Sequence, residues 1–99
     1  MQDAIRVVAR IIAKPGTEDR VKSVLSNLVK PTRQESGCLG YELLQNSENS
    51  AEFVLLEVWK NKAALDSHTA APHTQKAETQ VEDWLQQVPP DVRIYKTVI

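Results

Sequence analysis

The chain has 99 residues, of which 41% are hydrophobic and 25% charged, and its formal net charge is -1. This length and composition predict one globular domain over residues 1–99, and the mixed charges exclude both a basic nucleic-acid footprint and a basic amphipathic membrane helix. No apolar run approaches the roughly 20 residues that cross a bilayer, and the single cysteine, Cys38, fits a reducing cytoplasm, so we expect a cytoplasmic protein.

The first part of the chain predicts a strand followed by a helix. Residues 5–13 are rich in β-branched side chains and end at a Lys-Pro-Gly turn, which is typical of a strand. Thr17 is placed to cap a helix with an apolar stripe at three- and four-residue spacing. Pro31 removes a hydrogen-bond donor, so we expect a kink or a restarted turn over residues 32–36.

Two further strands are predicted at residues 38–46 and 51–59. The polar loop between them, residues 47–50, is short, so the strands should pair as an antiparallel hairpin. Alternation puts Phe53, Leu55, Glu57 and Trp59 on one face of the second of these strands. On the first, Tyr41 should share a face with Leu39 and Leu43.

The last part of the chain predicts a short helix over residues 61–69, a break at 70–72 and a second helix that opens at Pro72. The apolar stripe of the second helix continues to Val88, where Pro89 and Pro90 end it. Residues 92–99 are expected to form the final strand.

The order strand, helix, strand, strand, helix, strand indicates an α+β fold: a ferredoxin-like βαββαβ antiparallel sheet with its helices on one face. The central strand carries bulky apolar residues on both faces, and helices can cover only one of them. Because a monomer rarely leaves a large apolar patch in water, we expect a homodimer in which two sheets pack together.

His68 is the best candidate for acid-base chemistry, because an imidazole gains or loses a proton near neutral pH. The alternative is a helix histidine packed at the edge of the core. His73 is the weaker candidate, since it could simply pack or cap a helix. The two histidines are five residues apart across a proline, a spacing unlike a helical metal pair, although Glu57, Asp66 and Glu78 could join them; we expect no metal site.

Glu57 lies in register with apolar residues, so it is either paired to an arginine such as Arg6 or Arg10 or functional, and we take a structural salt bridge as the default. Trp59 stands at a strand exit, next to the break where a cavity could open. Cys38 has no base or cation near it in the sequence, which disfavours a reactive thiol.

Several segments together resemble the antibiotic biosynthesis monooxygenase domain family, and most closely its bacterial quinol monooxygenases. They are E-S-G-C-L-G-Y at residues 35–41, E-V-W at 57–59, D-S-H at 66–68 and T-A-A-P-H at 69–73. The resemblance covers essentially the whole chain. It implies a dimeric α+β barrel that oxygenates a quinol or polycyclic phenol with dioxygen and without metal, flavin or haem.

Under this resemblance His68 would accept or relay the substrate's proton. Tyr41, Phe53, Trp59 and Leu65 would shape an apolar substrate pocket, and Glu57 would be a further substrate-binding residue. His73 would hold a substrate oxygen or orient the pocket.

Two enzyme activities of related proteins, and one non-catalytic function, are alternatives to quinol oxygenation. Haem-degrading members use an asparagine, a tryptophan and a histidine, and the nearest positions here are Ala9, His68 and Glu78, which disfavours that activity. An isomerase that processes a phosphorylated autoinducer shares the histidine-containing segment. In that case a histidine and a carboxylate would move protons in a phosphorylated ketone. The remaining possibility is a non-catalytic dimer that binds a small apolar ligand.

Overall fold

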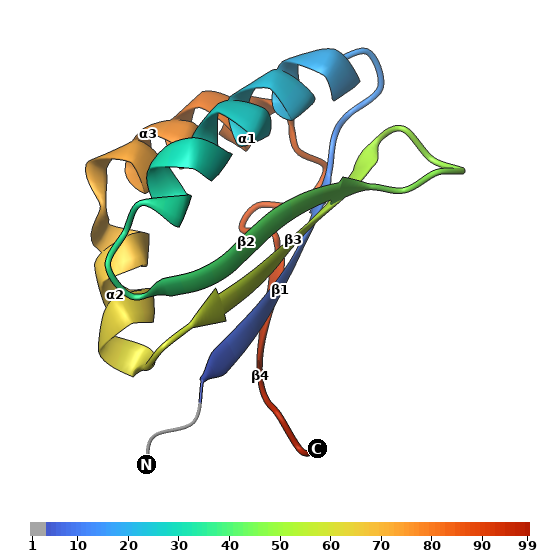
Figure 1. Ribbon diagram of the computed structural model, residues 1–99. Helices are drawn as coiled ribbons and strands as arrows, with labels where there is room; N and C mark the ends of the chain where they lie inside the picture. Colours follow the sequence, from blue (N-terminus) through green and yellow to red (C-terminus); the bar gives the residue numbers. More distant parts are fainter. Residues whose placement is uncertain (1–3) are drawn as a thin grey trace.

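The computed structural model describes residues 4–99, and its strands form one antiparallel sheet in the order β2-β3-β1-β4. Along the chain the elements are β1 (Ile5–Ile12), α1 (Glu18–Arg33), β2 (Cys38–Gln45), β3 (Glu52–Trp59), α2 (Lys62–Ala70), α3 (Pro72–Val81) and β4 (Asp91–Lys96). Helices α1 and α3 lie over one face of the sheet, and α2 follows β3 at its end (Figure 1). This arrangement confirms the predicted α+β ferredoxin-like fold. Within residues 4–99, no helix has the length and apolar character needed to cross a membrane.

The core lies between the sheet and the helices, and strand alternation builds it. On β3, Phe53, Leu55, Glu57 and Trp59 are all buried, while the residues between them are only partly covered. These four residues pair with Ile11, Ala9, Val7 and Ile5 of β1, in that order. The predicted division of β3 into two faces is therefore confirmed, and it places Glu57 inside the apolar layer.

The edge strand β4 is not covered by the helices. Val92 and Ile94 pair with Ala9 and Val7, which point toward the helix layer, so these β4 side chains lie on the same face. They are nevertheless 54% and 56% exposed. The space between the sheet and the helices is consequently less enclosed along β4 than along β3.

Helix α1 continues past Pro31 to Arg33, contrary to the expected kink or restarted turn. The proline lies in the last turn, where its missing N–H removes only one intrahelical bond. The backbone then tightens, with the Gln34 and Glu35 amides donating to the carbonyls of Pro31 and Thr32. Thr17 is the N-cap residue, but its hydroxyl donates to the Lys14 carbonyl and makes no side-chain cap.

The helix expected over residues 72–88 ends at Val81 and is followed by a single 3-10 turn at Glu82–Trp84. The backbone after this turn pairs with the end of β1: the Lys14 amide donates to the Trp84 carbonyl, and Leu85 bridges Ala13. These tertiary hydrogen bonds replace helical ones, so Leu85 is buried whereas Val88 is 56% exposed.

Alternation also fails at the start of β2, where the pairing with β3 shifts between Cys38 and Gly40. Such a bulge leaves one residue unpaired and redirects its side chain. Leu39 is therefore 62% exposed, while Tyr41 is buried. The prediction that both share one buried face was wrong for Leu39.

Candidate functional site

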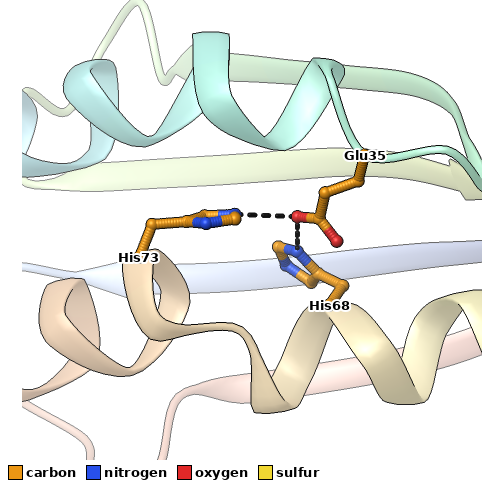
Figure 2. A group of neighbouring side chains, drawn as sticks. All are labelled: Glu35, His68 and His73. Carbon is orange, nitrogen blue, oxygen red and sulfur yellow. Dashed lines mark hydrogen bonds and ion pairs between the residues drawn. The ribbon is translucent and has the colours of Figure 1, made fainter.

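Glu35 lies between both histidines of the chain, as Figure 2 shows. One of its carboxylate oxygens, Oε2, is 2.8 Å from Nδ1 of His68 and 2.8 Å from Nε2 of His73. The His68 side chain is only 6% exposed, that of Glu35 is 17% exposed and that of His73 is 30% exposed. The cluster therefore runs from the buried interior to the surface.

Local sequence explains why the two histidines converge. Pro72 is tolerated at the start of α3 but not inside a continuous helix, so the chain turns between His68 on α2 and His73 on α3. Asn61 caps α2 by accepting a hydrogen bond from the Ala64 amide. The two helices then direct one ring each toward the turn that carries Glu35 (Figure 2).

Gly37 allows α2 to approach the Glu35 turn closely. A Cβ atom at this position would lie 2.2 Å from Cβ of Ala64, which no packed structure accommodates without movement. The Lys60 amide also donates to the Gly37 carbonyl at 2.9 Å. The E-S-G sequence thus brings the carboxylate and the His68 helix together.

The hydrogen bonds fix which nitrogens carry hydrogen. An ionised carboxylate only accepts, so Nδ1 of His68 and Nε2 of His73 must both donate to Glu35. In a neutral His68 ring the other nitrogen, Nε2, is then an acceptor. Glu35 therefore holds His68 in the tautomer that can take a proton at Nε2.

Trp59 connects His68 to a second carboxyl group. Its ring stacks on the His68 ring with centroids 4.6 Å apart, and its indole N–H donates to Oε1 of Glu57 at 2.9 Å. Burial raises the pKa of Glu57, which favours the neutral acid. The ring of Tyr41 meets His68 edge-on, with centroids 5.7 Å apart. His68 is thus held by Glu35, Trp59 and Tyr41 together.

A cavity of about 150 Å³ lies between the sheet and the helices, with His68 in its wall. Most of the lining is aliphatic and comes from β1, α1, α3 and β3. Pro90 and Val92 also line it, on the side that the helices leave open. The side chains with polar atoms that contribute to the wall are Tyr41, Glu57, His68, Thr69, Thr74 and Glu78.

The predicted site residues divide into three groups. Tyr41, Glu57, Leu65 and His68 line the cavity. Phe53 and Trp59 are completely buried and are not among its lining residues. His73 instead lines a shallow depression between α1 and α3; it hydrogen-bonds to Glu35, and its ring centroid lies 6.3 Å from that of His68.

The expected salt bridge from Glu57 to Arg6 or Arg10 is wrong. Both arginines are exposed, since they alternate with the buried residues of β1 and so lie on the outer face of the sheet. Arg10 pairs with Glu52, and Arg6 donates to the Thr97 hydroxyl. Glu57 lies on the inner face, where Trp59 is its hydrogen-bond donor.

Glu35 is the site residue that sequence reasoning did not select. It lies far from the histidines in the chain, and no local pattern in the E-S-G-C-L-G-Y segment marks it as a site residue. Its position two residues before Gly37, the glycine that allows α2 to approach, was the available signal. Within residues 4–99, the carboxylate that joins the histidines as a set of possible metal ligands is Glu35, and not Glu57, Asp66 or Glu78.

Cys38 is half-buried next to this turn, and burial raises its thiol pKa. A raised pKa reduces the thiolate fraction, which is the nucleophilic form. This environment agrees with the expectation of an unreactive thiol.

Comparison with known proteins identifies relatives along most of the chain. Residues 4–80 match the family model described as antibiotic biosynthesis monooxygenase. "Putative monooxygenase Rv0793" of Mycobacterium tuberculosis is 32% identical over 85 residues, which are 86% of this chain and 83% of the relative. The solved structure of Rv0793 has a TM-score of 0.90, at 29% identity, and the match covers 97% of this chain and 96% of that one.

Two further matches agree. An uncharacterized protein of Synechocystis is 31% identical over 94 residues, and this chain spans 63% of its length. The structure of PA3566 from Pseudomonas aeruginosa is 33% identical, with a TM-score of 0.86, over 98% of this chain and 94% of that one. The chain belongs to the antibiotic biosynthesis monooxygenase family.

Proposed function

We propose that this protein is a cofactor-independent monooxygenase that acts on a quinol or related phenol, with His68 as the base. The observation that carries the proposal is a buried imidazole, held by Glu35 with Nε2 as the acceptor, in the wall of a mainly apolar cavity. A phenolic hydroxyl placed against Nε2 would give up its proton there. The resulting anion is a good electron donor to dioxygen.

The cavity size supports an aromatic ring as the bound group. An apolar protein cavity of about 150 Å³ is large enough to bind benzene, and the cavity beside His68 has about the same volume. A single quinol ring would fill it. Further rings of a polycyclic phenol would extend toward Pro90 and Val92, where the helix layer leaves the cavity open.

The electrostatics of the wall suit a substrate that becomes an anion. The cavity wall contains the carboxyl groups of Glu57 and Glu78. Burial raises the pKa of Glu57 and favours its neutral form, which does not repel a quinolate. Glu78 is exposed, so water and salt screen its charge. Burial also raises the pKa of Tyr41, so its hydroxyl stays protonated. That hydroxyl is buried beside Thr32, and Tyr41 is among the residues that line the cavity.

The proposed reaction balances without another reductant. The quinol loses a proton to His68, and the quinolate transfers electrons to dioxygen while a ring carbon forms a bond to oxygen. His68 returns its proton to the outer oxygen of the peroxide that results. The O–O bond then breaks as the same ring carbon loses its hydrogen and forms a carbon–oxygen double bond, and the outer oxygen leaves as water with both hydrogens. One quinol and one dioxygen thus give one hydroxyquinone and one water.

The isomerase alternative lacks support from the cavity wall. A phosphorylated ketone needs a cation or a set of backbone donors for its phosphate. None of the residues within 4–99 that line the cavity is lysine or arginine. The apolar wall favours an aromatic substrate over a phosphosugar-like one.

We also propose that the protein is a homodimer. The outer face of the sheet carries Val54, Leu56 and Val58, all only partly covered, and β4 adds Tyr95, which is 49% exposed and pairs with the outward-facing Arg6. A partner sheet packed there would remove this surface from water. Sedimentation at micromolar concentration should show a dimer, and a single species of 11.1 kDa would contradict it.

Oxygen uptake by untagged, chelator-treated protein tests the proposed activity. One- and two-ring quinols are supplied, and their autoxidation is subtracted. His68→Gln removes the base and leaves a neutral amide of similar size, so uptake should fall by about 10²- to 10⁴-fold. Ser67→Ala, an exposed change on the same helix, is the matched control. Equal uptake by His68→Gln and wild type would rule out His68 as the base.

A further inference from the structure

We propose that Glu35, His68 and His73 form a binding site for one divalent transition-metal ion, of which Zn²⁺ is the best fit. One ligand-type atom from each residue lies within 4.8 Å of the other two. The three residues come from the turn after α1, from α2 and from α3, and their side chains point toward one another (Figure 2). Two imidazoles and one carboxylate, completed by water, are an established Zn²⁺ ligand set.

The observed spacing is close to what the ion needs. Zn²⁺ binds nitrogen and oxygen ligands at about 2.0–2.2 Å, which in a tetrahedron separates neighbouring ligand atoms by about 3.4 Å. Oε2 of Glu35 is now 2.8 Å from each histidine nitrogen. The carboxylate must therefore move away from each ring by about half an ångström, and the two ring nitrogens, which lie within 4.8 Å of each other, must come to the same separation of about 3.4 Å.

The ion would be reached from the surface and not through the cavity. Glu35 and His73 each line a shallow surface depression, and neither is among the residues that line the cavity. The His73 side chain is 30% exposed and gives solvent access to the cluster. An ion held at Nδ1 of His68 would consequently lie outside the cavity, which is the space proposed for the substrate.

Metal binding and proton acceptance by His68 exclude each other, an inference that rests on the proposed function. An ion at Nδ1 uses the lone pair of that nitrogen, so the hydrogen of a neutral ring must move to Nε2. Nε2 then becomes a donor and cannot take the substrate's proton. Zn²⁺ would act as a reversible inhibitor that works through the tautomer of the base.

Isothermal titration of chelator-treated, untagged protein with Zn²⁺ tests the site without reference to activity. One ion should bind per chain, and both His73→Gln and Glu35→Gln should weaken binding by at least about 10-fold. Matched controls are Glu78→Gln, an exposed carboxylate on α3, and Cys38→Ser, which removes the thiol; both should bind as wild type does. Circular dichroism confirms that each variant is folded.

Absence of binding by wild type, or equal binding by wild type and folded His73→Gln, would overturn the site. The inhibitory role has its own test in oxygen uptake. The Zn²⁺ concentration that halves uptake should match the measured Kd and rise in parallel with it in His73→Gln. Half-inhibition at the same concentration in both proteins would overturn the tautomer mechanism. Because Zn²⁺ has no redox chemistry, it does not oxidise the quinol itself. The calorimetric test of Zn²⁺ binding does not depend on turnover, so it stands even if the protein oxidises no quinol.

Discussion

Replacing Glu35 by glutamine should destabilise the fold measurably, although the side chain keeps its size. The carboxylate accepts hydrogen bonds from His68 and His73 through a single oxygen. A hydrogen bond to a charged group contributes about 1.5–3 kcal/mol and a neutral one about 0.5–1.5 kcal/mol, so each bond should weaken by about 1 kcal/mol. The His73 side chain is 30% exposed, so in the variant water compensates for part of the weakened hydrogen bond between His73 and residue 35. The net loss in unfolding free energy is then about 1–2 kcal/mol, or about 4–16 °C in Tm for a domain of this size.

Urea denaturation followed by tryptophan fluorescence measures this loss, because the buried Trp59 stacks on His68 and reports on the cluster. Glu42→Gln on β2 makes the same chemical change at an exposed position and should leave the midpoint unchanged. The slope of unfolding free energy against urea should be equal in all three proteins. A midpoint for Glu35→Gln equal to that of Glu42→Gln would refute the idea that the carboxylate holds the two rings.

Three further predictions concern stability. Because burial raises the pKa of Glu57, the contribution of this residue to stability is complete below the ordinary pKa of 4.5 and declines as pH rises through the folded-state pKa. The Tm of Glu57→Gln should therefore rise relative to that of wild type between pH 4.5 and neutrality. A Tm difference that does not change with pH would contradict this. Gly37→Ala places a Cβ 2.2 Å from that of Ala64 and should lower the free energy of unfolding, measured by urea denaturation, by about 1–3 kcal/mol. Gly40→Ala, whose Cβ would lie 3.5 Å from its nearest neighbour, should be tolerated. Equal losses of unfolding free energy in the two variants would contradict the close approach of α2 to Gly37. Trp59→Phe keeps a ring beside His68 but removes the donor to Glu57, and thermal melting should show a loss of about 1–3 kcal/mol; an unchanged Tm would mean that the indole bond is dispensable.

The fold was predictable because its signals are local and periodic. The alternation along β3 assigns Phe53, Leu55, Glu57 and Trp59 to one face, and the structure buries all of them. The short loop before β3 fixes the hairpin, and Pro72 marks the start of α3. Each of these features depends on residues within a few positions of one another, where strand pleating and helix geometry decide the outcome.

Errors arose where distant segments compete with local preference. The apolar stripe that continues to Val88 favours a longer α3. Residues 84–86 instead form hydrogen bonds with the end of β1, so the helix ends at Val81. Glu35 is the corresponding case in the site: no local pattern connects it to His68, and only the packing of α2 on Gly37 brings the two together. The five-residue spacing of His68 and His73 disfavours a pair of metal ligands on one helix. It does not bear on histidines that lie on two helices and meet a carboxylate, Glu35, from another part of the chain.

Incorporation of labelled oxygen would test the proposed monooxygenation most directly. Chelator-treated protein is incubated with a one-ring quinol under ¹⁸O₂, and the product is analysed by mass spectrometry beside a His68→Gln reaction. Wild type should yield hydroxyquinone with one labelled oxygen atom, together with labelled water, at a rate that His68→Gln lacks. An unlabelled quinone formed together with hydrogen peroxide, or a labelled product formed equally by His68→Gln, would contradict oxygen insertion driven by His68.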